Sequence, residues 1–227
     1  MTVAHRESGK AVPAVGLVGG WSFPAEMFAP LVRRLPSVEV SAHDWKGFAD
    51  TWLDDGVPVE VAGGTWLGWS LGGGLLLEAI ARGNIRPDRL VLVSATPRFL
   101  AADGWPGAAL GEWRALRRAA LADARSAACG FRRHFGLPGC AVLSPGESDH
   151  VSGLDWLAAI DRRDLLETLD MPVEVWLAPD DPLIPSTWSE QLALPRTVIG
   201  RRLPKSGHAA LFDAWDDLAR ALDPGAV

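Results

Sequence analysis

The chain has 227 residues, of which 48% are hydrophobic and 22% charged, with a mean hydropathy of +0.10 and a net charge of −6. This length fits one domain, because single cores run to about 250 residues before a chain divides. The composition argues against a disordered or membrane-spanning chain, and the acidic balance argues against a nucleic-acid binder. We therefore expect one folded domain over residues 1–227, with neither nucleic acid nor membrane as a partner.

Short apolar runs alternate with longer stretches of helical length along most of the chain. Such alternation is typical of a mostly parallel central sheet with helices on both faces, so it predicts an α/β fold. The expected strands are Ala14–Val18, Val38–Ser41, Thr65–Trp69, Leu90–Ser94, Val173–Leu177 and Thr197–Leu203. The expected helices are Ala25–Leu35, Leu71–Arg82, Leu157–Leu169 and Ala209–Leu222.

The alternation is interrupted once, after the strand Leu90–Ser94, where the interval between Thr96 and Gly153 contains no plausible central strand. That interval is far longer than the usual connection of about 2–6 residues in an α/β unit. We therefore expect a short helical cap inserted at about residues 98–153. Its segment Ala108–Ala128 is rich in alanine, with apolar residues at helical spacing, and predicts one amphipathic helix.

The cap segment is basic although the chain is acidic. Residues 98–133 have a net charge of +4, whereas residues 1–97 have −2 and residues 134–227 have −8. Five arginines supply most of the surplus: Arg114, Arg118, Arg125, Arg132 and Arg133. The first three recur at separations of four and seven and so share one helix face. This face is either an ordinary solvated surface or a binding surface for an acidic partner.

The sharpest motif is Gly68–Gly72, with the letters GWSLG, directly after an expected strand and directly before an expected helix. It matches G-x-S-x-G, the nucleophile elbow, in which a tight turn exposes the serine oxygen. The first N–H groups of the following helix also favour an anion beside Ser70. The motif predicts that Ser70 is a catalytic nucleophile, and the alternative is a glycine-rich turn with a structural role only.

A catalytic serine in this turn needs a carboxylate and a histidine, in the chain order Ser, Asp, His. Asp180 and Asp181 follow the expected strand Val173–Leu177, and His208 follows the last expected strand. Because parallel strands end at one edge of a sheet, these loops should meet Ser70. Of the five histidines, only His208 has this order and context, whereas both carboxylates remain candidates for the orienting role.

The loop after the first expected strand is a candidate part of an oxyanion hole. Such a hole takes one N–H group from the residue after the nucleophile and one from this loop. Gly19 and Gly20 let the backbone approach the turn closely. We therefore expect the N–H groups of Leu71 and Trp21 to form the hole, with a purely structural role for the glycines as the alternative.

No cofactor and no metal are expected, because the sequence contains neither a dinucleotide or phosphate-binding motif nor a His and Cys cluster with ligand spacing. Two cysteines, Cys129 and Cys140, are too few to suggest a disulfide framework. The first ten residues are polar and lack the apolar core of a signal peptide. The simplest expected location is the reducing cytoplasm.

On these residues the chain resembles the α/β-hydrolase superfamily and, within it, the pimeloyl-acyl carrier protein methyl ester carboxylesterases of biotin synthesis. The resemblance runs through most of the chain. The segments that carry it are Gly19–Ser22, Gly68–Gly73, Val93–Phe99, Asp103–Gly107, Leu154–Asp155, Asp161–Leu165, Asp181–Pro185 and His208–Ala210.

The resemblance implies an α/β-hydrolase fold and a serine esterase mechanism. In it, Ser70 attacks the methyl ester carbonyl, His208 takes and returns the proton, and Asp181 rather than its neighbour orients His208. The N–H groups of Trp21 and Leu71 would hold the oxyanion. The resemblance also implies that Phe135 and Leu137 line the acyl channel, and that the five cap arginines bind the acidic acyl carrier protein.

The leading hypothesis is a monomeric serine carboxylesterase that hydrolyses the methyl ester of a pimeloyl chain on acyl carrier protein. A general short-acyl carboxylesterase or thioesterase with the same three side chains is the first alternative. A non-catalytic hydrolase-like binding protein is the second.

Overall fold

Six parallel strands form the centre of the molecule. The computed structural model describes residues 14–53, 63–140, 143–144, 146 and 149–223. Its strands are β1 (Ala14–Val18), β2 (Glu39–His43), β3 (Thr65–Trp69), β4 (Arg89–Val93), β5 (Val173–Leu177) and β6 (Val198–Arg202). They pair in the order β2-β1-β3-β4-β5-β6, and every neighbouring pair is parallel. The predicted α/β class is therefore confirmed, with strand boundaries that differ from the prediction by two residues at most.

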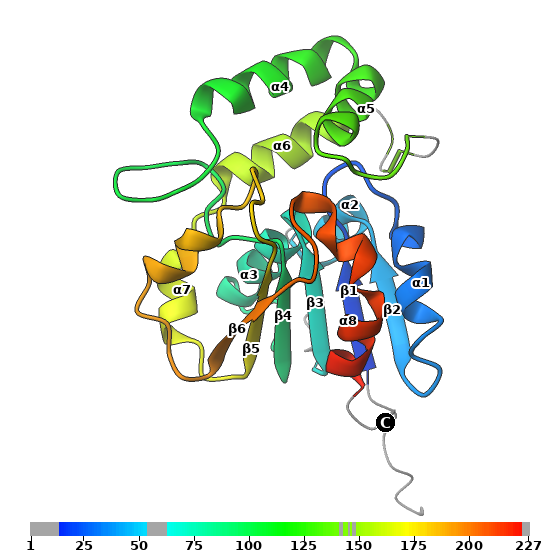
Figure 1. Cartoon of the computed structure of the whole chain (residues 1–227), viewed down its shortest axis with the longest axis vertical. Coiled ribbons are helices and arrows are strands. Elements are labelled where there is room, and N and C mark those ends of the chain that lie inside the picture. The colour runs from blue at the N-terminus through cyan, green and yellow to red at the C-terminus, as the bar shows by residue number, and fades with distance from the viewer. Residues whose placement is uncertain (1–13, 54–62, 141–142, 145, 147–148, 224–227) are drawn as a thin grey trace, which may run out of the picture.

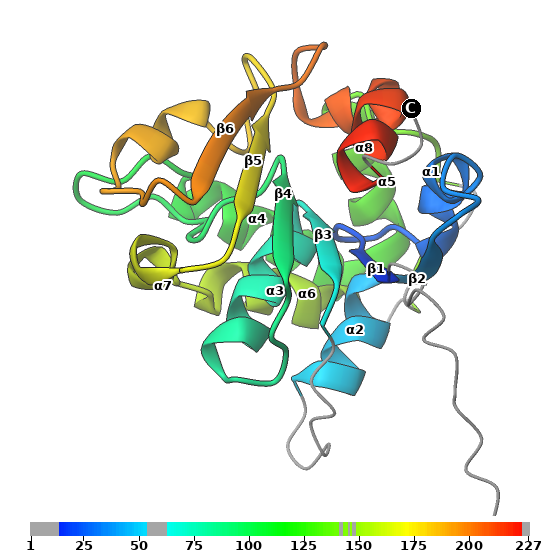
Figure 2. The ribbon, with the colours of Figure 1, turned by 90° about the horizontal axis from the view of Figure 1, so that it is seen from below.

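Helices cover both faces of this sheet (Figures 1 and 2). On one face lie α1 (Ala29–Val32) and α8 (Trp215–Leu222), and on the other lie α2 (Trp45–Trp52), α3 (Leu71–Ala81) and α7 (Arg163–Thr168). Strand β4 shows how the sheet supplies both cores. Leu90 and Leu92 belong to the core beneath α3, whereas Val91 and Val93 belong to the core beneath α8, because successive strand residues point to opposite faces.

Three predicted helices differ from the observed ones at their ends or in their continuity. The first helix begins as a 3₁₀ turn, Ala25–Phe28, before α1, and the last begins as a 3₁₀ turn, His208–Asp213, before α8. The helix predicted at Leu157–Leu169 is wrong, since α6 (His150–Ala159) ends and α7 begins within it. Ile160 between them has an extended ψ of 122°, which stops the helix.

Helix α2 is absent from the sequence prediction, although its start has an ordinary local signal. The Asp44 carboxylate accepts a hydrogen bond of 2.7 Å from the Gly47 N–H group, as an N-cap residue does. The helix is only eight residues long, but its apolar residues Trp45, Phe48, Ala49 and Trp52 recur at the i, i+3, i+4 and i+7 spacing of an amphipathic helix, which is a second local signal.

The cap consists of α4 (Leu110–Ala122), α5 (Ala124–His134) and α6, which lie together above the carboxyl ends of the strands (Figure 1). It follows β4 as predicted and extends beyond the predicted interval to the end of α6. The prediction of one helix over Ala108–Ala128 is wrong. Asp123 breaks it with an extended backbone and caps α5 by accepting a 2.9 Å hydrogen bond from the Ser126 N–H group.

The two cysteines are joined, a pairing that their small number in the sequence did not suggest. Cys129 in α5 and Cys140 form a disulfide across a sequence separation of 11 residues. The count alone could not reveal the pair, because bonding depends on the distance between Cα atoms, which here is 5.4 Å.

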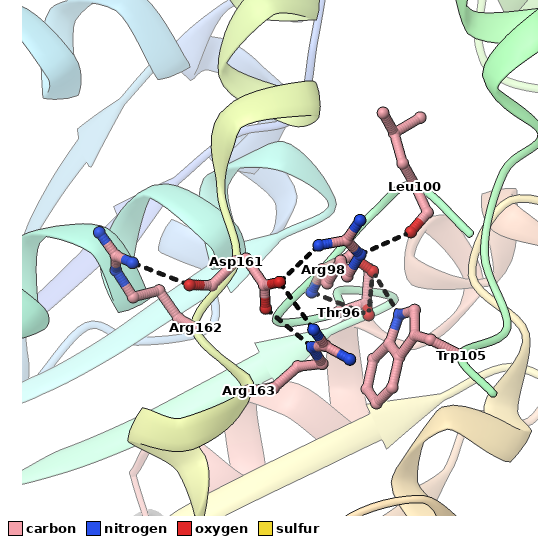
Figure 3. Close-up of polar contacts among 7 residues, drawn as sticks. All are labelled: Thr96, Arg98, Leu100, Trp105, Asp161, Arg162 and Arg163. Carbon is pink, nitrogen blue, oxygen red and sulfur yellow. Dashed lines mark hydrogen bonds and ion pairs between the residues drawn. The ribbon is translucent and has the colours of Figure 1, made fainter. Parts of the chain in front are cut away.

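The two chain segments that connect the cap to the sheet are clamped together by Asp161 (Figure 3). Its carboxylate accepts a hydrogen bond from Arg98, in the segment that follows β4. It also accepts two hydrogen bonds from Arg163, at the start of α7, with an Nε–Oδ1 distance of 2.8 Å and an Nη2–Oδ2 distance of 2.9 Å. Beside this pair, Arg162 bonds the buried Glu78 of α3 at 2.8 Å. The cap is therefore attached to the core by forked, charged hydrogen bonds.

The same contacts decide the ionisation of Asp161. Partial burial opposes the charged form most strongly, yet the hydrogen bonds and charges of Arg163 and Arg98 together outweigh it and lower the pKa of Asp161 below its ordinary value. A carboxylate whose folded pKa is lowered stabilises the fold above its unfolded pKa, and this contribution is lost as the pH falls through the folded pKa.

We predict that Asp161→Asn lowers the free energy of unfolding at pH 7 by about 1 kcal/mol, a value reduced by the solvent exposure of the network. The difference from wild type should shrink below about pH 4, where the carboxylate is protonated in the unfolded chain. Urea unfolding between pH 3 and pH 7 measures both effects. Asp103→Asn, at an exposed position before α4, is the control. An equal loss in that variant would contradict the stabilising role of the Asp161 contacts.

Candidate active site

Ser70 lies in a strained turn between β3 and α3. Its backbone has φ 55° and ψ −122°, a combination that a non-glycine residue adopts only when its surroundings hold it there. A Cβ atom at Gly72 would lie 2.2 Å from the Val18 carbonyl oxygen, and one at Gly68 would lie 2.5 Å from the Gly73 Cα. The two outer glycines of the motif are therefore required by close backbone approach on both sides of Ser70.

The three loops predicted to converge do meet at this turn. His208 Nε2 lies 3.0 Å from Ser70 Oγ, and His208 Nδ1 lies 2.9 Å from Asp181 Oδ2. Asp181 Oδ1 accepts hydrogen bonds from the N–H groups of Leu183 and Ile184 at 2.9 and 3.1 Å. The result is a continuous chain of hydrogen bonds from buried backbone N–H groups to the serine hydroxyl.

Burial separates the two candidate carboxylates. Asp181 is 5% exposed and His208 is 2% exposed, whereas Asp180 is exposed and adopts a left-handed φ of 51° in the turn. The indole of Trp69, next to Ser70 in sequence, stacks on the His208 ring with centroids 5.4 Å apart. The imidazole is thus fixed at its face by an aromatic ring and at its Nδ1 edge by Asp181.

The loop that follows β1 lies against the elbow. Val18 and Gly68 are register partners at the ends of β1 and β3, which places the two loops side by side. A Cβ atom at Gly20 would lie 3.1 Å from the Ser70 Cβ and 2.8 Å from the Trp69 ring. Trp21, 4% exposed, follows Gly20, and Leu71 is the first residue of α3, whose N–H group has no acceptor within its own helix.

An apolar cavity of about 480 Å³ connects Ser70 and His208 with the underside of the cap. Phe135 and Leu137, both predicted to line an acyl channel, are among its lining residues. Most of the other apolar walls were not predicted from the sequence. These come from the cap and its connections: Phe99, Trp113, Leu116, Phe131, Leu154 and Leu157. Trp113 and Leu116 could have been found from their helical spacing, but which wall they form depends on how the helices pack.

Four of the five cap arginines are exposed: Arg114, Arg118, Arg125 and Arg133. Leu121, 61% exposed, accompanies them at the end of α4. Arg132 is different, since only 2% of its surface is accessible and it lies beneath the cap. The prediction that Arg132 faces a carrier protein is therefore corrected: the residue occupies the inner face of α5 because its guanidinium bonds Ser22 in the loop after β1.

Among the residues that the structure describes, no three His, Cys, Asp or Glu side chains are grouped as ligands for a metal ion. In the same residues, no helix combines the length and apolar character needed to cross a membrane.

The parallel sheet, the cap and the Ser–His–Asp contact define this molecule as a hydrolase of the α/β type. The chain belongs to the alpha/beta hydrolase family, whose model matches residues 14–221. The class prediction of a carboxylic ester hydrolase is confirmed by relatives that span most of the chain. A pimeloyl-acyl carrier protein methyl ester esterase from Xanthomonas campestris pv. campestris (strain B100) is 31% identical over 92% of this chain and 93% of its own. A protein of the same name from Methylococcus capsulatus is 25% identical over the same shares.

Solved structures agree with the fold. An esterase from Exiguobacterium antarcticum superposes with a TM-score of 0.73 at 19% identity, covering 94% of this chain and 91% of its own. The enol-lactonase from Burkholderia xenovorans gives a TM-score of 0.69 at 15% identity, covering 96% and 92%. At these identities the likeness concerns the fold alone.

We predict that Gly72→Ala lowers the free energy of unfolding by about 2–3 kcal/mol, because its methyl group overlaps backbone that cannot move aside cheaply. Urea denaturation measures this change. Gly111→Ala in α4 is the matched control: a Cβ atom there meets nothing within 4 Å, so it should leave stability unchanged or raise it by up to about 1 kcal/mol. Equal stability of the two variants would contradict the steric account.

Proposed function

We propose that this protein is a serine carboxylesterase that hydrolyses the methyl ester of a pimeloyl chain carried by acyl carrier protein. The observation that carries the proposal is the hydrogen-bonded series Ser70, His208 and Asp181 at the end of an apolar cavity. The proposed substrate is the one that the names of the relatives give.

In the first half of the reaction, Ser70 Oγ attacks the ester carbonyl carbon while His208 Nε2 takes its proton. Asp181 keeps the imidazole oriented and stabilises the positive charge that forms on it. The carbonyl electrons move to the oxygen, which accepts hydrogen bonds from the N–H groups of Trp21 and Leu71. Collapse of this intermediate breaks the bond to the methoxy oxygen, and His208 returns the proton so that methanol leaves.

In the second half, water replaces methanol at the acyl-enzyme. His208 takes a proton from the water as its oxygen attacks the acyl carbon, and the same N–H groups hold the oxyanion. The bond to Ser70 Oγ then breaks, and His208 returns the proton to the serine. The product is a free carboxylate at the far end of the pimeloyl chain, and the enzyme is unchanged.

The shape of the cavity supports an acyl chain as the substrate. A volume of about 480 Å³ lies within the range of about 300–1,000 Å³ found for small-molecule sites. Its walls are mainly aromatic and aliphatic, which suits methylene groups. Ser70 lies on the sheet side and the cap forms the opposite wall, so an extended chain entering past the cap would present its distal ester to the serine.

The outer face of the cap supports an acidic partner. Arg114 and Arg118 on α4 and Arg125 and Arg133 on α5 are exposed, as is Leu121 on α4. Guanidinium groups make forked hydrogen bonds to carboxylates and phosphates. We propose that acyl carrier protein docks here, and that the enzyme acts as a monomer in the cytoplasm.

The chemistry is tested by labelling with a fluorophosphonate, which reacts with activated serine hydroxyls. We expect stoichiometric labelling of wild type, none of Ser70→Ala, and a labelling rate at least about 100-fold lower for His208→Ala. Ser94→Ala is the control, because Ser94 also adopts a left-handed φ, of 41°, but is buried elsewhere at the end of β4. Equal labelling of Ser70→Ala and wild type would end the esterase proposal.

The substrate is tested in a biotin auxotroph that lacks its own pimeloyl ester esterase. Wild type should restore growth and Ser70→Ala should not. Hydrolysis of simple esters without restored growth would instead indicate a general short-acyl esterase or thioesterase. A protein that neither labels nor hydrolyses any ester would be a binding protein with a hydrolase fold.

Docking is tested by charge reversal on the cap. Arg114→Glu and Arg118→Glu should each lower kcat/KM for the carrier-linked substrate about fivefold, since an exposed ion pair contributes up to about 1 kcal/mol. Turnover of p-nitrophenyl acetate should not change. The loss should grow at low salt, because at 0.1 M salt exposed charges are screened beyond about 10 Å. Equal losses on both substrates would indicate that these arginines form only an ordinary solvated surface.

A further inference from the structure

Arg132 is a charged side chain buried between the cap and the core. It lies in α5 and is 2% exposed, and its guanidinium carbon is 3.8 Å from the centroid of the Phe23 ring. Burial lowers the pKa of Arg132 to about 10, so the group still carries its charge at neutral pH. A buried cation is retained only where its hydrogen bonds compensate for lost water.

Two of the hydrogen bonds of Arg132 end on one residue of the loop after β1. Arg132 Nε donates to Ser22 Oγ at 3.1 Å, and Nη2 donates to the Ser22 carbonyl oxygen. Nη1 donates to the Gly139 carbonyl at 2.7 Å, next to the Cys140 of the cap disulfide. The Arg132 side chain therefore joins the cap to the loop after β1, which lies against Ser70.

Ser22 needs such a support because of its backbone. The Phe23 N–H group bonds the Gly20 carbonyl at 3.2 Å, which makes Gly20–Phe23 a tight turn. Ser22 is its third residue and has φ 72°, the left-handed conformation that type II turns usually give to glycine. A serine keeps this strained conformation only where its neighbours hold it there.

The preceding residue in the turn is also attached to the cap. The Trp21 indole Nε1 donates to the His150 carbonyl of α6 at 2.7 Å, and its ring contacts Phe131 of α5 edge-on at 5.2 Å. Because Gly20 packs against Ser70, any rotation of this turn would move the Trp21 N–H group relative to the serine oxygen.

We propose that Arg132 is a positioning residue of the oxyanion hole, which holds Ser22 in its left-handed conformation and thereby aims the Trp21 N–H group at the reacting carbonyl oxygen. This inference rests on the proposed esterase function. Arg132 does not line the cavity at Ser70 and touches no substrate there. Through this arginine the cap contributes to the geometry of the oxyanion hole as well as to the wall of the proposed acyl site.

The test measures kcat and KM for p-nitrophenyl acetate, which needs no carrier protein. Arg132→Met should lower kcat about 10- to 100-fold with little change in KM, somewhat less than the effect of deleting an oxyanion donor outright. Arg132→Lys should recover part of the loss, since one ammonium group can still bond the Ser22 carbonyl.

Ser22→Gly separates positioning from general stability. Glycine adopts a positive φ without strain, so the loss of kcat caused by Arg132→Met should be smaller in a Ser22→Gly background than in wild type. A role in cap stability alone would give the same loss in both backgrounds. Arg117→Met is the matched control, because Arg117 also bonds within the cap, to Asp155 at 2.6 and 3.0 Å, and makes neither of the Ser22 contacts. Its kcat should stay within about twofold of wild type.

Melting temperature is measured for every variant. Wild-type kcat in a folded Arg132→Met, or equal losses in Arg132→Met and Arg117→Met, would overturn the positioning role while leaving the esterase intact. If Arg132→Met does not fold, Arg132→Lys with and without Ser22→Gly gives the same comparison. A wild-type protein that neither hydrolyses the ester nor reacts with fluorophosphonate would overturn both proposals.

Discussion

Ser70 adopts a backbone conformation that costs a non-glycine residue about 1–3 kcal/mol, and the packing of β1, β3 and α3 around it supplies the support. Gly68 and Gly72 allow that packing because backbone atoms of neighbouring segments occupy the space where their side chains would be. The same closeness brings the loop after β1 against the elbow. The site therefore depends on a steric constraint first, and the hydrogen bonds of His208 and Asp181 act on a serine that is already exposed by the turn.

The cap forms part of the candidate site and is attached to the core by polar contacts. Its helices provide most of the apolar walls of the cavity. They are attached to the core both at the connecting segments and near Ser70. At the connections, Asp161 joins the outgoing and returning segments through Arg98 and Arg163. At the centre, Arg132 and Trp21 link α5 and α6 to the turn beside Ser70. A cap fixed in this way both shapes the cavity beside Ser70 and restrains the loop that the proposed mechanism uses to stabilise the oxyanion.

Arginine, which outnumbers lysine 19 to 3 in the sequence, performs three different tasks in this structure. At the cap connections its fork bonds both oxygens of one carboxylate. Beneath the cap, Arg132 bonds two carbonyl groups and a hydroxyl while its flat face covers Phe23. On the outer cap, Arg114 and Arg118 are exposed, and we propose that they bind an acidic partner. A lysine could replace the last of these more easily than the first two, because an ammonium group has neither the fork nor the flat face.

The sequence by itself determined the parallel α/β sheet, the elbow at Ser70 and the presence of a cap, because strand and helix periodicity, glycine spacing and the order of loops after strands are local properties. It also singled out His208 by its place after the last strand. It did not separate Asp180 from Asp181 without a family resemblance, and it assigned Arg132 to the wrong face of the cap. It also gave no sign that Cys129 and Cys140 form a disulfide. Those points were decided by tertiary structure alone, because burial, the direction of a side chain and the distance between remote residues arise only when helices pack on the sheet and on one another.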